Sequence, residues 1–168
     1  MKIYLAADHA GFDIKEKVKV NLEEKEYEIE DCGAYEFNKD DDYPDFISLA
    51  AENVSKNPQD AKGIIFGGSG QAEAIVANKF KNVRCAIFYS PALPVGVADV
   101  TGRMSTDPYE MIRLAREHND TNMLSIGARF LKADEAIKVV SLWLQAPFEQ
   151  AERHVRRIEK IKKIEDGL

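Results

Sequence analysis

The sequence predicts an α/β fold, a three-layer doubly wound sandwich around a mainly parallel five-stranded sheet. Two observations lead to this prediction. Short β-prone runs alternate with segments of helical period, which is typical of a parallel sheet with helices on both faces. The chain has 168 residues, 45% of them apolar, and no repeat, low-complexity tract or linker divides it. Residues 1–168 should therefore form one domain with its own core.

The expected elements alternate in chain order, strand before helix. The β-prone runs predict strands at Lys2–Ala7, Glu28–Asp31, Gly63–Phe66, Arg84–Phe88 and Met123–Ile126. Helical periodicity between them predicts helices at Phe12–Glu24, Pro44–Lys56, Glu73–Phe80, Pro108–Glu117 and Ala133–Leu144. A charged terminal helix is expected from about Pro147 to Glu165. Right-handed crossovers between the strands then give a doubly wound sheet.

Polar and glycine residues follow four of the predicted strands. They are Asp8-His9, the turn from Gly67 to Glu73, Ser90-Pro91 and Gly127-Ala128-Arg129. Doubly wound sheets bind ligands at the carboxyl ends of their strands, and these ends share one edge. The sequence therefore predicts a ligand site at that edge.

The glycine turn, Gly67-Gly68-Ser69-Gly70, follows an apolar strand directly and is the most informative of these segments. Its glycines let backbone N–H groups approach a ligand closely, and the helix expected near Gln71 adds its positive dipole end. Glu73 brings a carboxylate to the first turn of that helix. The combination predicts a site that holds an anionic ligand and removes a proton from it, although a glutamate in a first turn also serves as a simple helix cap.

Composition excludes several classes of partner. A net charge of −6 argues against general affinity for nucleic acid or membrane surfaces, which require a basic face. No apolar run reaches membrane-spanning length, and Met1–Ala7 lacks the length of a signal h-region. Cys32 and Cys85 fit neither a metal-ligand nor a disulfide spacing, so a reducing cytoplasm is the expected location. The acidic run Asp40-Asp41-Asp42 is interpreted as a solvated loop rather than a metal site.

The stretch from Ser90 to Asp107 is expected to be irregular. It contains two prolines and two glycines and is long for a loop in a compact domain. Long loops of this kind often act as lids or partner contacts. We expect a loop insertion at about residues 90–107, in which Pro94–Asp107 covers the active edge or extends a subunit interface.

Six short motifs occur together in one order along the chain. They are Asp8-His9-Ala10-Gly11-Phe12, Asp42-Tyr43-Pro44, Gly68-Ser69-Gly70, Ala77-Asn78-Lys79, His118-Asn119-Asp120 and Arg153-His154. The set resembles the type B ribose-5-phosphate isomerases, a family that includes the galactose-6-phosphate isomerase subunits, over nearly the whole chain apart from the long loop. The resemblance implies a Rossmann-like aldose–ketose isomerase of sugar phosphates that uses neither metal nor cofactor. It also implies a homodimer or homotetramer with shared active sites, in which the C-terminal helix, about residues 147–165, is exchanged across the dimer interface.

One position departs from much of this family, because many members have a cysteine base where this chain has Gly67. A second branch has a Gly-Gly-Ser-Gly turn followed by a glutamate, and this chain resembles that branch. Glu73 is therefore expected to be the base that moves a proton between C1 and C2 through an enediolate. Partial burial would raise its pKa, while Ser69 and backbone N–H groups near Gly70 stabilise the charge on oxygen. Gly68 and Gly70 are expected to line the substrate.

The resemblance gives roles to further residues. His118 is expected near the active edge as the acid–base that opens the sugar ring, although it is equally plausible as a histidine that stabilises a helix C-terminus. Asp8 would orient sugar hydroxyls and His9 would contact phosphate or ring oxygen, unless the pair simply caps the following helix. The remaining sugar contacts are expected from Tyr43, Asn78 and Asn119.

Phosphate binding requires cations. Arg129 follows a predicted strand, and Arg153 and Arg157, four residues apart, share one face of the terminal helix. The guanidinium fork donates two hydrogen bonds at once, and His154 would add a third donor. Composition alone favours a merely solvated helix, whereas the resemblance implies that these residues bind phosphate in the site of the neighbouring subunit.

Other functions were weighed against this one. A dinucleotide site does not fit, because the turn Asp8-His9-Ala10-Gly11 lacks Gly-x-Gly-x-x-Gly. A non-catalytic sugar-phosphate sensor or an inactive partner subunit stays open, since the family includes hetero-oligomers and Gly67 replaces one branch's base. Ribose 5-phosphate is the leading substrate, and the alternatives are galactose 6-phosphate, allose 6-phosphate and a tetrose phosphate.

Overall fold

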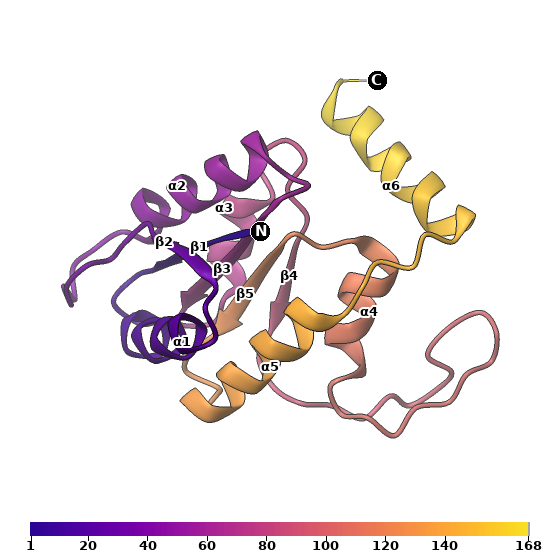
Figure 1. The fold of residues 1–168 in the computed structure, drawn as a ribbon, viewed down its shortest axis with the longest axis horizontal. Helices are drawn as coiled ribbons and strands as arrows, with labels where there is room; N and C mark the ends of the chain where they lie inside the picture. The colour runs from indigo at the N-terminus through magenta and orange to yellow at the C-terminus, as the bar shows by residue number, and fades with distance from the viewer. Residues whose placement is uncertain (168) are drawn as a thin grey trace.

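A computed structural model describes residues 1–167 and is shown as a ribbon in Figure 1. The strands are β1 (Lys2–Ala7), β2 (Glu28–Asp31), β3 (Ala61–Gly67), β4 (Cys85–Phe88) and β5 (Met123–Gly127). The helices are α1 (Phe12–Glu24), α2 (Tyr43–Lys56), α3 (Gln71–Ala77), α4 (Glu110–Asn119), α5 (Ala133–Gln145) and α6 (Glu152–Glu165). The strands form one parallel sheet in the order β2-β1-β3-β5-β4. The predicted doubly wound α/β fold is confirmed.

Helices cover both faces of the sheet and produce three layers. Successive residues of β3 point to opposite faces, so Ile64 and Phe66 pack in one core cluster and Ile65 in the other. The first cluster includes side chains of α1, α4 and α5, and the second includes side chains of α2 and α3. Because both faces of β3 are buried, this central strand reads as a nearly continuous apolar run.

The topology brings the strand ends of interest side by side. The chain first crosses from β1 to β2 on one side, then passes back to β3 on the other side of β1. The winding direction therefore reverses between β1 and β3, which is where doubly wound sheets form a ligand crevice. Ala7 pairs with Phe66, and Gly67 pairs with Gly127. The residues that follow β1, β3 and β5 consequently lie in neighbouring rows.

α3 differs slightly from its expected extent of Glu73–Phe80. Gly70 has φ +74°, a left-handed conformation that lets the helix begin at the next residue. At the other end the Asn78 side chain makes two hydrogen bonds with the backbone of Cys85, of 2.9 and 3.1 Å. These bonds redirect the chain toward β4, so the helix stops at Ala77.

α6 begins at Glu152 rather than at about Pro147, where the terminal helix was expected. Proline disfavours the helical region for the residue before it, so α5 ends before Ala146, which is extended with ψ 124°. The residue that precedes α6, Ala151, is also extended, with ψ 136°. In Figure 1, α6 projects away from the three layers, beyond α4. Its Glu165 carboxylate accepts a hydrogen bond from the Asn82 backbone N–H (2.9 Å), just before β4. None of the helices within residues 1–167 is both long and apolar enough to cross a bilayer.

Candidate active site

The glycine turn, Gly67–Gly70, joins β3 to α3 at the carboxyl edge of the sheet, as predicted. The Ser125 hydroxyl of β5 donates a hydrogen bond to the Gly70 carbonyl oxygen (2.7 Å). A Cβ atom at Gly70 would lie 3.0 Å from that hydroxyl and 3.1 Å from the Gly127 nitrogen, and its φ of +74° strains any other residue. Glycine at position 70 therefore lets the turn pack closely against β5.

The Glu73 side chain folds back from α3 over the end of β3. Its carboxylate fills the space beside the Gly67 backbone, where an added Cβ atom would overlap it. The Glu73 carboxylate thus occupies the space that a side chain at position 67 would need, and glycine has none. Glu73 is 3% exposed, and its Oε2 atom is buried with no hydrogen-bond partner among residues 1–167.

These surroundings raise the pKa of Glu73 above its ordinary value. Burial is the largest cause, and the negative charge of Asp8 acts in the same direction. A hydrogen bond from the residue's own backbone N–H and the positive charge of Arg129 oppose the increase. A buried carboxylate with a raised pKa is a stronger base than an exposed glutamate, as proton abstraction from carbon requires.

Asp8 lies next to the glycine turn and shapes the loop between β1 and α1. Its Oδ1 atom accepts hydrogen bonds from the backbone N–H groups of Ala10 (3.0 Å) and Gly11 (3.1 Å). A Cβ atom at Gly11 would lie 2.5 Å from the carbonyl carbon of Phe66. The absence of a side chain at Gly11 therefore brings the β1–α1 loop against the end of β3. Sequence reasoning gave Gly11 no role of its own.

Arg129 reaches the same edge from the end of β5. Its backbone N–H donates to the Gly68 carbonyl (3.1 Å), and its guanidinium lies close to Gly68, where an added Cβ would be 3.1 Å from Cζ. The Ser69 hydroxyl accepts a hydrogen bond from the backbone N–H of Gln71 (3.3 Å). Gly68, Ser69, Gly70, Glu73 and Arg129 are thus brought together as predicted. We refer to these residues, with Asp8 and His9, as the glutamate half-site.

An aromatic pair near this edge was not predicted. The rings of Tyr89, after β4, and Phe130, after β5, meet edge to face with centroids 6.1 Å apart. The Tyr89 hydroxyl accepts a hydrogen bond from the Gln71 side chain (3.3 Å). The sequence could have indicated this pair, because both residues follow strands and residues that follow parallel strands lie at this edge.

His9 contacts an acidic residue that sequence reasoning assigned to solvent. The Asp41 Oδ1 atom accepts hydrogen bonds from the His9 backbone N–H (3.1 Å) and ring Nδ1 (2.7 Å). The Asp41 side chain is 6% exposed, whereas that of Asp40 is 77% exposed. The interpretation of the acidic run as solvated is therefore wrong for Asp41. Tyr43, at the start of α2, is partly buried against the second core cluster.

A second group of predicted residues lies between the end of α4 and the start of α6. We call it the histidine–arginine cluster, and its members are His118, Glu149, Arg153, His154 and Arg157. The His118 and His154 rings stack with centroids 4.2 Å apart, and Glu149 Oε2 lies 3.9 Å from Nε2 of each ring. Burial, followed by the positive charges of His118 and Arg153, lowers the pKa of His154.

The long loop borders this cluster. Residues Val97–Val100 line a cavity of 370 Å³ together with His118, Arg153, His154 and Arg157. The buried Nε atom of Arg153 and Nε2 atom of His154 have no hydrogen-bond partner in the described part of the chain. Buried polar atoms without partners are rare and indicate a missing ligand or water. The cluster is therefore suited to an anion such as phosphate.

The glutamate half-site and the histidine–arginine cluster lie at opposite edges of the sheet. α4 runs back toward the amino edge, where the Asn119 carbonyl accepts a hydrogen bond from the Arg84 Nε–H (3.0 Å) just before β4. The five residues of β5 that separate the edges span roughly 16 Å. Within one chain, the expectation that His118 lies near the active edge is wrong. In a parallel sheet, a helix that is followed by a strand ends where that strand begins, at the amino edge. The order of α4 and β5 in the sequence therefore already indicated where His118 lies.

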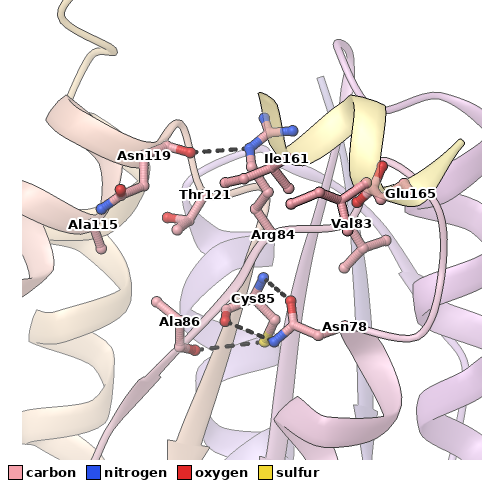
Figure 2. Close-up of a pocket in the computed structure, with 11 residues that line it drawn as sticks. Asn78, Val83, Arg84, Cys85, Ala86, Ala115, Asn119, Thr121, Ile161 and Glu165 are labelled. Carbon is pink, nitrogen blue, oxygen red and sulfur yellow. Dashed lines mark hydrogen bonds between the residues drawn. The ribbon is translucent and has the colours of Figure 1, made fainter. Parts of the chain in front are cut away.

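A larger cavity, of 470 Å³, also lies away from Glu73. Figure 2 shows its lining, formed by β4, the end of α4 and α6. It contains the predicted sugar contacts Asn78 and Asn119 but no residue of the glycine turn. Asn78 is already bonded to the Cys85 backbone. The structure of one chain therefore does not bring these two asparagines to the glutamate half-site.

Comparison with known proteins identifies the family. The family described as Ribose/Galactose Isomerase matches residues 3–93 and 97–161. The chain belongs to this family. Ribose-5-phosphate isomerase B of Mycolicibacterium paratuberculosis is 37% identical over 165 residues, which cover 98% of this chain and 92% of the relative.

Solved structures of the Ribose/Galactose Isomerase family share the fold. The structure of ribose-5-phosphate isomerase B from Mycoplasma genitalium with bound ribulose-5-phosphate has a TM-score of 0.85 and 34% identity, covering 99% of this chain and 97% of that one. The enzyme from Clostridium thermocellum gives a TM-score of 0.83 and 34% identity, with 99% of both chains covered. The recognised resemblance is thus confirmed.

Two groups of side chains in this isomerase-family chain place three metal-type donors within 4.8 Å of one another, His118-Glu149-His154 and Asp8-His9-Asp41. The first is not arranged as a metal centre. The stacked rings of His118 and His154 are nearly parallel, at 15°, so one ion cannot lie in both ring planes. In the other group, Asp8 Oδ1 and Asp41 Oδ1 already accept two hydrogen bonds each. Catalysis without metal stays a prediction.

Proposed function

We propose that this protein is an aldose–ketose isomerase that interconverts ribose 5-phosphate and ribulose 5-phosphate, with Glu73 as the base. The observation that carries the proposal is the buried Glu73 carboxylate beside the glycine turn, which has a raised pKa and one oxygen without a hydrogen-bond partner among residues 1–167. Relatives named ribose-5-phosphate isomerase B support the choice of substrate. A cytoplasmic location accords with this activity.

In the proposed reaction Glu73 removes the C2 proton of the open-chain aldose while the C1 carbonyl becomes an enediolate. A proton then moves between the two oxygens, and protonated Glu73 returns its proton to C1 as the C2 ketone forms. The raised pKa of Glu73 lowers the free-energy cost of keeping its carboxyl group protonated between the two proton transfers. The Ser69 hydroxyl and backbone N–H groups of the glycine turn stabilise the negative oxygen, and Asp8 orients the hydroxyls.

We infer that each active site combines residues of two chains. A five-carbon sugar phosphate is shorter than the roughly 16 Å between the two edges, so one chain cannot contact it with both groups. In a homodimer, or a pair of dimers, Arg153, His154 and Arg157 bind the phosphate of the sugar held by the partner's Glu73. His118 then opens the sugar ring. The projection of α6 from the body of the chain supports its exchange between subunits (Figure 1).

We propose that the long loop limits the length of the sugar. This rests on the position of Val97–Val100 in the cavity of the histidine–arginine cluster. Deletion of Pro94–Asp107 should change the ratio of activity on ribose 5-phosphate to activity on galactose 6-phosphate or allose 6-phosphate. An unchanged ratio and an unchanged oligomeric mass would show that the loop has neither expected role.

The test of the reaction is NMR of ribose 5-phosphate incubated in D₂O with protein treated with EDTA. We expect ribulose 5-phosphate to form and deuterium to enter at carbon. Glu73→Gln should lower kcat by about 10³-fold, within the range of general-base contributions, and should leave inhibition by inorganic phosphate intact. Undiminished turnover in this variant would exclude Glu73 as the base. If wild-type protein binds sugar phosphates without converting pentose, hexose or tetrose phosphates, the non-catalytic alternative holds.

A further inference from the structure

The contact between His9 and Asp41 joins two segments that are 32 residues apart in the sequence. His9 follows β1, and Asp41 lies in the loop that precedes α2. One carboxylate oxygen accepts both the backbone N–H and the ring Nδ1 of His9, at 3.1 and 2.7 Å. Two bonds to one residue fix both the backbone and the ring, so the imidazole cannot rotate freely.

The chemistry of the partners determines which ring nitrogen carries the proton. An ionised carboxylate accepts hydrogen bonds and donates none. The His9 Nδ1 atom must therefore be the donor, and in the neutral ring Nε2 is left as an acceptor. The His9 side chain keeps 28% exposure although Nδ1 lies against Asp41, so part of the ring remains open to a ligand.

The Asp41 carboxylate depends on this contact. Its side chain is 6% exposed, and within residues 1–167 His9 is the only basic side chain with a nitrogen within 4.0 Å of its oxygens. The second oxygen, Oδ2, is buried and has no hydrogen-bond partner in the described part of the chain. A buried carboxylate is costly unless it is paired. Asp8 also places a donor atom within 4.8 Å of the His9 and Asp41 donors, and its Oδ1 is bonded to the Ala10 and Gly11 backbone N–H groups. The rings of His9 and Phe37 meet edge to face with centroids 6.4 Å apart.

We propose that Asp41 is a positioning residue, which holds His9 with its Nδ1–H toward the carboxylate and directs Nε2 toward the substrate. A neutral ring accepts a hydrogen bond at Nε2 from a substrate hydroxyl, and a protonated ring donates one there to a phosphate oxygen. The effect on turnover rests on the proposed isomerase activity. The predicted tautomer of His9 does not depend on that activity, because it is a property of the free protein.

The first experiment is long-range ¹H–¹⁵N NMR of the histidine rings at alkaline pH, without substrate. The chain has three histidines, so loss of one signal in His9→Asn assigns His9. We expect wild-type His9 to carry its proton on Nδ1, and Asp41→Asn to shift the population toward Nε2–H. A wild-type His9 that carries its proton on Nε2 overturns the proposal, whatever reaction the protein catalyses and whether or not the variant folds.

The second experiment compares two neighbouring variants with the same change of charge. Asp41→Asn should lower kcat/KM by about 10- to 100-fold, the scale for a hydrogen bond to a charged group. Asp40→Asn should stay within about twofold of wild type, because Asp40 is exposed and its nearest cation is Lys39 at 3.8 Å. Equal kinetics of the two variants would contradict the positioning role. A normal melting temperature of Asp41→Asn separates loss of positioning from loss of fold.

Discussion

The two halves of the proposed site are built in different ways. The glutamate half-site is made mainly by backbone: the glycine turn, the β1–α1 loop and the end of β5 pack so closely that added Cβ atoms would collide. The histidine–arginine cluster is made by long side chains of α4, α6 and the segment before α6. The first supplies the buried carboxylates of Glu73 and Asp8 with Arg129 beside them, and the second supplies Arg153, His154 and Arg157. Under the proposed function, close backbone packing fixes the reacting group, and long side chains bind the distant charged end of the substrate.

The largest expected effect tests whether the two halves belong to different chains. Glu73→Gln and His118→Asn should each be nearly inactive alone. When the two proteins are unfolded together and refolded, random pairing should restore about a quarter of the wild-type activity, because half of the dimers are mixed and each has one intact site. Turnover before and after mixing is the measurement. A mixture as inactive as its parents would mean that each site is built within one chain.

The second prediction concerns the close packing of the glutamate half-site. Gly67→Ala should lower kcat about 100-fold, because the methyl group displaces the Glu73 carboxylate and a misplaced base is costly. Gly96→Ala in the long loop is the matched control, since its added methyl meets nothing within 4 Å. Steady-state kinetics of both variants decide the matter. Normal kcat in Gly67→Ala would show that the base is elsewhere or moves without loss.

The third prediction concerns the cations of the other half. Arg157→Gln should raise KM by about 10- to 100-fold with a smaller change in kcat, because it removes charge-assisted hydrogen bonds to phosphate. Arg156→Gln is the control, since Arg156 is adjacent but pairs with Glu152 at 3.5 Å on the exposed surface. Both variants are compared in KM and in inhibition by inorganic phosphate. Equal values for the two would remove Arg157 from the phosphate site.

The smallest expected effect is on stability. Because burial raises the native-state pKa of Glu73, the protonated form stabilises the fold at low pH, and this stabilisation is lost as pH rises through the native pKa. Glu73→Gln should therefore melt above wild type at neutral pH. The difference should vanish in acid, below the ordinary glutamate pKa. Melting curves between acid and neutral pH test this, and a variant less stable than wild type at pH 7 contradicts it.

Much of the glutamate half-site was predictable, because parallel strands end at one edge and their following residues must meet there. Asp8, Gly68 and Arg129 were placed in this way. Asp41 was not, since three adjacent aspartates look solvated and its burial depends on the path of a loop toward His9. The start of α6 was missed because the helical pattern of charges does not reveal that Ala151, just before the helix, is extended with ψ 136°.

The overlap between a side chain at position 67 and the Glu73 carboxylate also limits how the chain can evolve. A first step of Gly67→Cys would push the glutamate aside before the new thiol had surroundings that ionise it. A first step that removes Glu73 would leave no carboxylate in its place. The two positions are therefore epistatic, and exchanging one kind of base for the other requires both changes or a weakly active ancestor between them. Steric exclusion alone is therefore sufficient to retain the glutamate in a lineage that already has it.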